Sequence, residues 1–418
     1  MAATNTLASA KVFANAGLVL LKNSLVMGKL VTGEELNSFY TSEKAGAATG
    51  GTVYVKRPPE YVVRDGKVAS PQDTLQGEVA VAIDKQKGVD VQFSSFEETL
   101  SVDSLLKSQS MKSAMAQLAS QVDSDLMATT IEFPSWVGTP GQKIDSPADF
   151  FEAPQRLDEL CVPMTDRNAV LTPADTYGIA GNLLANAGQA GNEVAKNALQ
   201  KAKIPMLGNT EPYMSQTVYN LTCGTRNATA AVNGAAQNVT FANVRTNFQQ
   251  SLVIDGVGAA KTIKKGEVFT IAGVYAVNPR TKSQETFLRQ FVVLADTVSD
   301  GAGNATITIA NPIITTGAYQ NVSAAPADDA VITWLGAAST SYRQNAAFHK
   351  SAIKLVSAKL IRPYTGESES ATDPDTGITV RYWRYSDGTN DLHNHRYDII
   401  YGCVNVDRRL GTRVSGTA

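Results

Sequence analysis

The chain has 418 residues, and its 37 Lys and Arg against 39 Asp and Glu leave a formal net charge of -2 at neutral pH. This near-balance argues against general nucleic-acid binding, because neutralising phosphates needs a surplus of cations. Three cysteines are too few for a secreted scaffold built on disulfides. The longest early apolar run, residues 16–21, is far shorter than the roughly 20 residues of a membrane-spanning helix. We therefore expect no membrane contact and a chain that stays in the cytoplasm.

The first part of the chain is predicted to be an arm followed by a strand. Residues 1–45 show a broken amphipathic pattern typical of a partly helical arm. Residues 52–57 form a strand that Pro58 and Pro59 must end, because proline donates no hydrogen bond to a β ladder.

A long charged hairpin is predicted to follow. The turn residues 64–67 and the alternating strand at residues 78–84 complete a two-stranded excursion over residues 51–91. Such a hairpin is marginally stable alone, so it needs another surface to lie on.

The clearest helix spans residues 102–127, with Ser101 as its N-cap. Its apolar positions recur every three or four residues and line one side. A groove for a cofactor would be the alternative interpretation of this stripe, but core packing is the ordinary role of such residues. The aligned side chains are Met111, Met115, Leu118, Val122 and Leu126.

Three further helices and one strand are predicted next. A Ser cap before Pro147 begins a helix that Pro154 should kink or divide. Residues 168–171 form a short strand, and the same capping logic at Pro173 begins a helix that continues to residue 184. A fourth helix is expected over residues 190–201.

From residue 223 to 344 the chain loses almost all helical periodicity. Strands are predicted at residues 266–276, 285–298 and 304–309, the last two joined by a glycine-rich turn. This pattern favours a small antiparallel barrel or sandwich. Because longer charged strands return afterwards, the block is typical of an inserted domain. Those later strands are expected at residues 353–361, 378–385 and 396–406.

No catalytic or cofactor site is predicted. His393 and His395 could share one face of a strand with Asp398 nearby, but a solvated loop is the preferred interpretation over a metal site. Residues 373–377 lack the downstream Glu and the oxygen spacing of a calcium loop, so a plain loop between strands is favoured. The cysteines are isolated, which argues against redox chemistry and a zinc ribbon. We therefore expect no enzyme, no cofactor and no metal.

Several segments, in this order, resemble one protein family. They are residues 53–58, 169–173, 265–274, 385–388 and 396–402. Together they are similar to the major capsid (coat) proteins of short-tailed double-stranded DNA phages, whose HK-ninety-seven-type fold carries an inserted β-barrel. The resemblance implies an α+β fold with an N-terminal arm, extended loop, spine helix, and peripheral and axial domains, plus the all-β insert.

The resemblance also implies a division of the chain. In sequence order the parts are residues 1–45 (N-terminal arm), 46–95 (extended loop), 96–150 (spine helix and peripheral domain), 151–222 (axial domain), 223–344 (inserted β-barrel) and 345–418 (return to axial and peripheral strands).

The implied function is a major capsid protein of the virion, assembled in the host cytoplasm. Hexamers and pentamers of the chain would form an icosahedral shell around double-stranded DNA, contacting the DNA only non-specifically. A scaffolding protein would guide a precursor shell that expands on maturation, and a portal protein would join it. The alternatives are an encapsulin-like compartment of the same fold and a β-rich binding or adhesion protein.

The charges of the extended loop are the candidates for contact between subunits: Lys56, Arg57, Arg64, Asp65 and Lys67. Exposed ion pairs contribute only about 0.2–1 kcal/mol each, which suits a shell built from many weak contacts. Replacing Arg57 and Arg64 by Glu is expected to leave a folded monomer and to lower shell yield.

Overall fold

The computed structural model describes residues 10–36, 52–69, 71–94, 96, 109–185 and 204–417. Ser101 and the helix expected over residues 190–201 lie outside these residues. Contacts divide the chain into two compact units. The first comprises Met1–Tyr54, Ala80–Leu126 and Ile353–Val404, and the second comprises Val55–Val79, Met127–Ala352 and Asn405–Ala418. The finer division into six parts stays a prediction.

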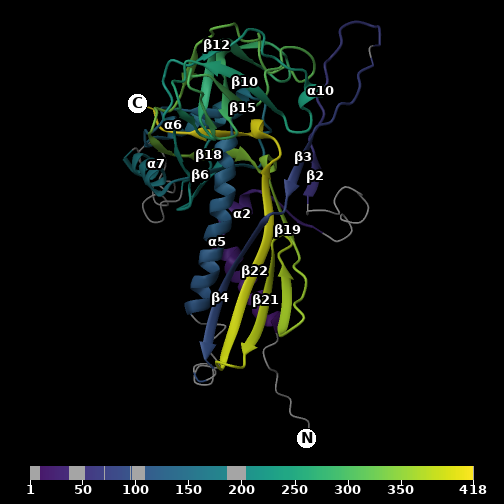
Figure 1. The fold of residues 1–418 in the computed structure, drawn as a ribbon, viewed down its shortest axis with the longest axis vertical. Helices are drawn as coiled ribbons and strands as arrows, with labels where there is room; N and C mark the ends of the chain where they lie inside the picture. The colour runs from purple at the N-terminus through teal and green to yellow at the C-terminus, as the bar shows by residue number, and fades with distance from the viewer. Residues whose placement is uncertain are drawn as a thin grey trace. The chain divides into compact units, whose positions relative to one another are not determined.

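Among the described residues of the first unit, six strands form a sheet around the long strand β22 (Figure 1). All ten residues of β4 pair with β22 in antiparallel register. The sheet order is β1 (Thr32–Leu36), β19 (Ile353–Ala358), β22 (Leu392–Asn405), β21 (Thr379–Asp387) and β20 (Glu367–Thr372), with β4 (Lys85–Ser94) also on β22.

Two helices pack on the tyrosine-bearing face of this sheet. They are α1 (Ala10–Ser24) and α5 (Gln109–Thr129). Tyr397 meets both, because its hydroxyl donates to Met111 Sδ at 3.7 Å and its ring leaves no room for a side chain at Gly17. A Cβ at Gly17 would lie 2.7 Å from the Tyr397 ring. The predicted apolar stripe of the long helix is confirmed: Met111, Met115, Leu118, Val122 and Leu126 are all buried.

A buried carboxylate joins α5 to the short helix α2 (Met27–Leu30). Asp123 accepts hydrogen bonds from the backbone N–H groups of Val26 at 2.7 Å and Gly28 at 3.0 Å. Burial raises the pKa of Asp123 to about 6, although these backbone donors oppose the shift. These two hydrogen bonds hold the beginning of α2 to the long helix α5.

The predicted hairpin over residues 51–91 is wrong in its extent. Only β2 (Thr52–Lys56) and β3 (Glu78–Ala82) pair as a two-stranded sheet, and residues 57–77 contain neither helix nor strand where they are described. The end of β2 before Pro58 is as predicted. β4 leaves the hairpin because β22 offers it a full-length ladder in a larger sheet, where three or more strands are independently stable.

In the second unit the strands of the insert form an antiparallel sheet that closes into a barrel. The two edges of its sheet meet, because Val232 N–H donates to Ala330 O at 3.0 Å and Ile332 N–H donates to Ala230 O at 2.9 Å. The inward side chains of these strands form one buried core. The strand order is β16 (Ile332–Trp334), β12 (Val268–Val277), β13 (Gln284–Val293), β15 (Ala305–Ala310), β10 (Gln249–Asp255) and β9 (Ala231–Val232).

The predicted strand over residues 285–298 is interrupted. β13 ends at Val293, and β14 (Thr297–Val298) pairs with β11 (Thr262–Ile263) instead. Asp296 causes the break, since its carboxylate accepts from Lys265 N–H at 2.8 Å and from Lys264 Nζ at 2.7 Å. A side chain engaged in this way draws the backbone out of the barrel ladder.

A second sheet of this unit packs against α6 (Pro147–Glu159), with α7 (Pro173–Ala185) beside it. Ser146 caps α6 by accepting Asp149 N–H at 3.2 Å, as the sequence predicts. Of the two predicted effects of Pro154, a kink or a division, the division does not occur, because burial of Phe150, Ala153 and Leu157 on one face holds α6 in one piece. The sheet order is β5 (Ser135–Val137), β23 (Gly411–Val414), β18 (Asn345–His349), β6 (Arg167–Leu171) and β7 (Thr210–Met214).

The remaining described elements are short. They are β8 (Asn220–Thr222), β17 (Ser341–Arg343), α10 (Phe241–Val244), η2 (Thr130–Glu132), η3 (Lys350–Ala352) and η4 (Arg408–Leu410). Among the described helices, none has the length and apolar character needed to cross a membrane.

Candidate functional site

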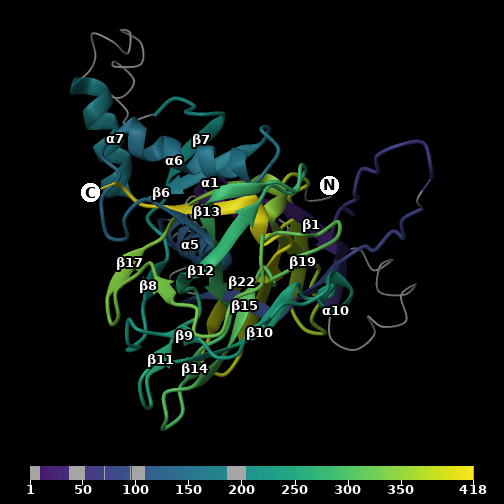
Figure 2. The same ribbon diagram turned by 90° about the horizontal axis from the view of Figure 1, so that it is seen from above.

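The loop between β2 and β3, residues 57–77, carries most of the predicted contact residues and extends away from the rest of its unit in both ribbon views (Figures 1 and 2). At its base Arg57 N–H donates to Gly77 O at 2.7 Å. Tyr319 then bridges the two arms: its hydroxyl accepts from Glu60 N–H at 3.2 Å and donates to Leu75 O at 2.7 Å. The base is therefore closed by a residue from the insert.

Further along the 57–77 loop, side chains replace the backbone ladder of a hairpin. Gln72 pairs with the backbone of Val62 in both directions, accepting its N–H at 2.9 Å and donating to its carbonyl at 2.5 Å. The hydroxyls of Tyr61 and Thr74 are 3.1 Å apart. At the turn, Gly66 adopts a φ of 83°, a conformation that favours glycine. Side-chain hydrogen bonds therefore hold the two arms of the loop together, and the residues between them, 63–68, form its tip.

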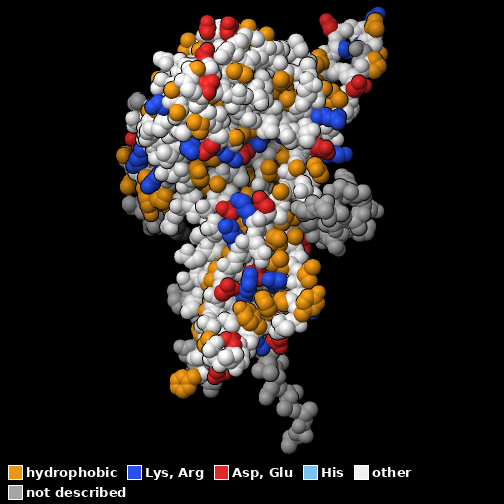
Figure 3. Space-filling model, viewed as in Figure 1, with side chains coloured by type: hydrophobic (Ala, Val, Ile, Leu, Met, Phe, Trp, Pro, Cys, Tyr) orange, Lys and Arg blue, Asp and Glu red, His pale blue; other side chains and the backbone are white. Residues whose placement is uncertain are grey.

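The tip presents charge beside apolar surface. Val63 is 93% exposed and Val68 is 83% exposed. Arg64, Asp65 and Lys67 are exposed next to them, and the projecting loop in Figure 3 shows basic, acidic and hydrophobic side chains together. Apolar side chains with this much exposed surface contribute almost no burial free energy to the fold of their own chain.

The five predicted contact residues separate into two groups. Lys56, Arg64, Asp65 and Lys67 are exposed, whereas Arg57 is only 5% exposed. The Arg57 Nε donates to Val406 O at 2.7 Å, and its guanidinium lies over the Phe248 ring at 5.1 Å. Burial lowers the pKa of Arg57 to about 10. Arg57 therefore fastens the loop to its own subunit and is not available to a neighbour in this structure.

A network of charges under the loop strengthens this attachment. Arg409 forms ion pairs with Glu60 on the loop and with Asp407 beside it. Lys282 Nζ approaches the other Glu60 oxygen at 3.7 Å. Burial of Asp407 would raise its pKa, but the charge and hydrogen bonds of Arg409 hold that pKa below its usual value.

The two histidines weighed as metal ligands lie in a strand. His393 and His395 are both in β22, so the predicted solvated loop is wrong. His395 is 3% exposed, and its Nδ1 lies 2.6 Å from the hydroxyl of Tyr382. The strand continues here because β4 pairs with β22 along this stretch. Across the described ranges no group of three His, Cys, Asp or Glu side chains could hold a metal ion.

The loop at residues 373–377 lies between β20 and β21, as predicted, and it holds a lysine where a calcium loop would hold an ion. Lys22 Nζ lies 2.8 Å from Asp373 Oδ1 and 2.5 Å from Asp375 Oδ2. These bonds raise the pKa of Lys22. The carboxylates therefore fasten α1 to this turn.

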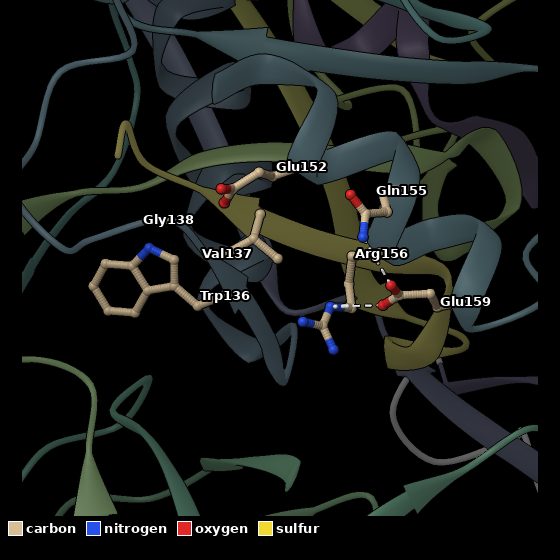
Figure 4. A pocket seen from close by; sticks show the side chains of 7 residues that line it. All are labelled: Trp136, Val137, Gly138, Glu152, Gln155, Arg156 and Glu159. Carbon is tan, nitrogen blue, oxygen red and sulfur yellow. Dashed lines mark hydrogen bonds and ion pairs between the residues drawn. The ribbon is translucent and has the colours of Figure 1, made fainter. Parts of the chain in front are cut away.

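A pocket of about 290 Å³ lies between α6 and the end of β5 (Figure 4). Within it Gln155 and Arg156 both point to Glu159: Gln155 Nε2 is 3.0 Å from Oε1, and Arg156 Nε is 3.4 Å from Oε2. Both oxygens of this carboxylate are thus engaged by its own helix. The lining residues include no His, Cys or Ser that could act as a nucleophile or base; they are Trp136, Val137, Gly138, Glu152, Gln155, Arg156 and Glu159.

Two residues that shape the 57–77 loop could not be identified from the sequence. Tyr319 is separated by 244 positions from the carbonyl it binds, and no local pattern marks it. Gln72 lies between Pro71 and Asp73 in an ordinary polar stretch. Only the folded chain reveals either connection.

Comparison with known proteins gives one match over nearly the whole chain. Residues 1–416 match the family described as "P22 coat protein - gene protein 5". No curated protein matches significantly.

The solved structures that match this chain include phage proteins. A structure from Mycobacterium phage Che8 is 14% identical, with 93% of this chain and 90% of that chain covered and a TM-score of 0.43. The mature capsid of bacteriophage PhiM1 is 11% identical, with coverage of 94% and 86% and a TM-score of 0.43. The CUS-3 coat protein I-domain is 28% identical over 26% of this chain and 96% of that chain, with a TM-score of 0.20.

Proposed function

The chain belongs to this family of phage coat proteins, matched over residues 1–416, and from that premise we propose that its 57–77 loop makes contacts between subunits of the shell. The protein is a major capsid protein that assembles the icosahedral shell of a phage virion, a structural and not an enzymatic role. The predicted fold class is confirmed: an α+β HK-ninety-seven-like capsid fold with a barrel-like insert.

One observation carries the loop proposal: its base is fixed to the subunit, whereas the valines of its tip are uncovered and the Arg64 side chain bonds only to the carbonyls of Gly66 and Val68 within the tip. Val63 and Val68 are almost fully exposed. Within the described residues, no ion pair forms at Asp65 or Lys67. A neighbouring subunit that covers the two valines would bury apolar surface, a gain of about 25 cal/mol per Å². The charges of Lys56, Arg64, Asp65 and Lys67 would then set the orientation of the contact.

The charge reversal that tests this contact should avoid Arg57. The substitution Arg57→Glu would bury a carboxylate against the carbonyl oxygen of Val406, where no donor balances its charge. It would therefore test folding and not assembly. Replacing Arg64 and Lys67 by Glu changes only exposed positions. We expect an unchanged unfolding midpoint for the monomer and a reduced yield of closed shells, measured by sedimentation and electron microscopy of the full chain.

A matched variant controls for charge alone. Replacing Arg280 and Arg343 by Glu makes the same change of net charge at exposed positions outside the 57–77 loop. The proposal requires a larger loss of shells from the loop variant than from this control. Equal yields of normal shells from the loop variant and the unchanged protein would contradict it.

The family also supports a proposed order of assembly. A scaffolding protein guides a precursor shell, the shell incorporates a portal protein, and it expands as double-stranded DNA enters. The net charge of -2 fits a container that holds DNA without binding it tightly. Expressing the chain with and without its phage's scaffolding protein tests the first step. Uniform shells should require the scaffolding protein, and uniform shells of the chain alone would contradict the proposed order.

A further inference from the structure

The pocket between α6 and β5 is polar on its helix side. Two carboxylates against one guanidinium leave its lining with a net charge of -1. Its volume of about 290 Å³ is below the roughly 300–1,000 Å³ of pockets for drug-sized ligands. The volume therefore suits one long side chain. The polar lining residues recur at the spacing of a single helix face, and they are Glu152, Gln155, Arg156 and Glu159.

Glu152 is the carboxylate of this pocket that has no partner. Gln155 and Arg156 both engage Glu159, at 3.0 and 3.4 Å. Glu152 makes no hydrogen bond or ion pair within the described residues, and in Figure 4 its carboxylate lies apart from the cluster around Glu159. Its charge acts on Arg156 only from that distance. The pocket therefore offers a carboxylate to a cation that enters from outside.

The tip of the 57–77 loop carries the opposite net charge. Its two cations, Arg64 and Lys67, outnumber its one acid, Asp65. The Arg64 guanidinium is used within the loop, because it donates to the carbonyls of Gly66 and Val68. Lys67 is exposed and makes no hydrogen bond or ion pair among the described residues. Lys67 is therefore the tip cation that is available to a carboxylate.

Apolar surface lies beside both charged groups. On the tip, Val63 and Val68 are 93% and 83% exposed. On α6, Phe151 is 44% exposed and precedes Gln155 by four residues, so it borders the same helix face. The pocket and the tip therefore match in apolar surface as well as in charge.

The pocket and the tip lie on opposite sides of the second unit. Figures 1 and 2 both show α6 on one side of this unit and the 57–77 loop extending from the other. A subunit therefore does not fill its own pocket with its own tip. Complementary surfaces on opposite sides of one subunit join copies head to tail, and such heterologous contacts close rings.

We propose that Lys67 at the loop tip of one subunit enters the α6 pocket of the next subunit and pairs there with Glu152. This inference rests on the proposed function of the 57–77 loop and names the surface that its tip binds. The contact repeats around a ring, so each subunit gives one tip and receives one.

Exchange of the two charges tests the pair in the full chain, expressed with its phage's scaffolding protein. Lys67→Glu and Glu152→Lys should each lower the yield of closed shells severalfold, because the contact recurs at every subunit. The double variant Lys67→Glu with Glu152→Lys should recover most of that yield, since it restores an opposite-charge pair. The control Asp145→Lys makes the same charge change at an exposed position that does not line the pocket, and it should assemble as the unchanged protein does.

The single variants separate this inference from the proposed function. A loss of shells with Lys67→Glu but not with Glu152→Lys would overturn the pocket assignment and leave the loop function in place. Normal yields from both single variants and from the reversal of Arg64 and Lys67 together would contradict both. Losses in both single variants that the double variant does not recover would overturn the pairing.

A disulfide trap tests the same geometry without reversing a charge on α6, so it also decides the case if Glu152→Lys does not fold. Lys67→Cys combined with Gln155→Cys alters two exposed positions. Oxidised shells of this variant should give a ladder of covalently linked subunits on non-reducing gels. Each variant with only one of the two changes controls for the three native cysteines and should run as a monomer. Shells of the double-cysteine variant that give only monomers would overturn the proposal.

Discussion

The barrel and the 57–77 loop belong to one compact unit, yet they are stabilised in opposite ways. The barrel closes its own sheet and buries its apolar side chains in one core. The loop has few backbone bonds, is fastened by Arg57, Tyr319 and Gln72, and leaves its valines in water. The barrel is therefore complete in one subunit, whereas the exposed loop tip is the surface that we propose a neighbouring subunit covers.

The largest expected difference between the two regions is the loss of free energy of unfolding when a β-branched aliphatic side chain is truncated in each. Ile307 is fully buried opposite Leu252 in the barrel. Ile307→Ala should lower the free energy of unfolding by about 2–5 kcal/mol, because it leaves a cavity. Val68→Ala at the exposed tip should change it by less than about 0.5 kcal/mol. Urea unfolding of the monomer measures both, and comparable losses would show that the tip is packed in its own subunit.

The half-buried carboxylate of Glu132, in η2, predicts a pH dependence of stability. Glu132 binds Lys265 at 2.7 Å and Arg408 at 2.9 Å. Burial would raise the pKa of Glu132, but these cations hold it at about 2. Since the folded-state pKa is lowered, its stabilisation is complete above pH about 4.5 and is lost as pH falls through about 2.

Glu132→Gln should therefore cost about 3 kcal/mol at neutral pH, the free energy that corresponds to this shift, and should match the unchanged protein below pH about 2. Denaturant unfolding across pH 2–7 measures the difference. A constant gap between Glu132→Gln and the unchanged protein at every pH would contradict the assignment.

The smallest expected loss of stability is at the base of the 57–77 loop. Tyr319→Phe removes the hydroxyl that joins Glu60 and Leu75, which should cost about 1 kcal/mol locally. Amide hydrogen exchange should become faster at Glu60 while the barrel amides stay protected. Exchange that rises equally in the barrel would show that the loop and the barrel open together.

Much of the secondary structure could be predicted because its causes are local. Pro58 ends β2, Ser146 caps α6, and the apolar spacing of α5 marks its buried side. The failed predictions depended on distant partners. β4 was predicted in a hairpin but pairs with β22, and Asp296 divides a strand through bonds to Lys264 and Lys265.

The sequence alone determined the family, since the match runs over residues 1–416, and with it the role in a phage shell. It also determined that charges gather at the 57–77 loop. Only the tertiary structure decided that Arg57 is buried and that Tyr319 closes the loop base. Periodicity, capping and proline act within a few residues, whereas burial and long-range hydrogen bonds exist only after distant segments have met.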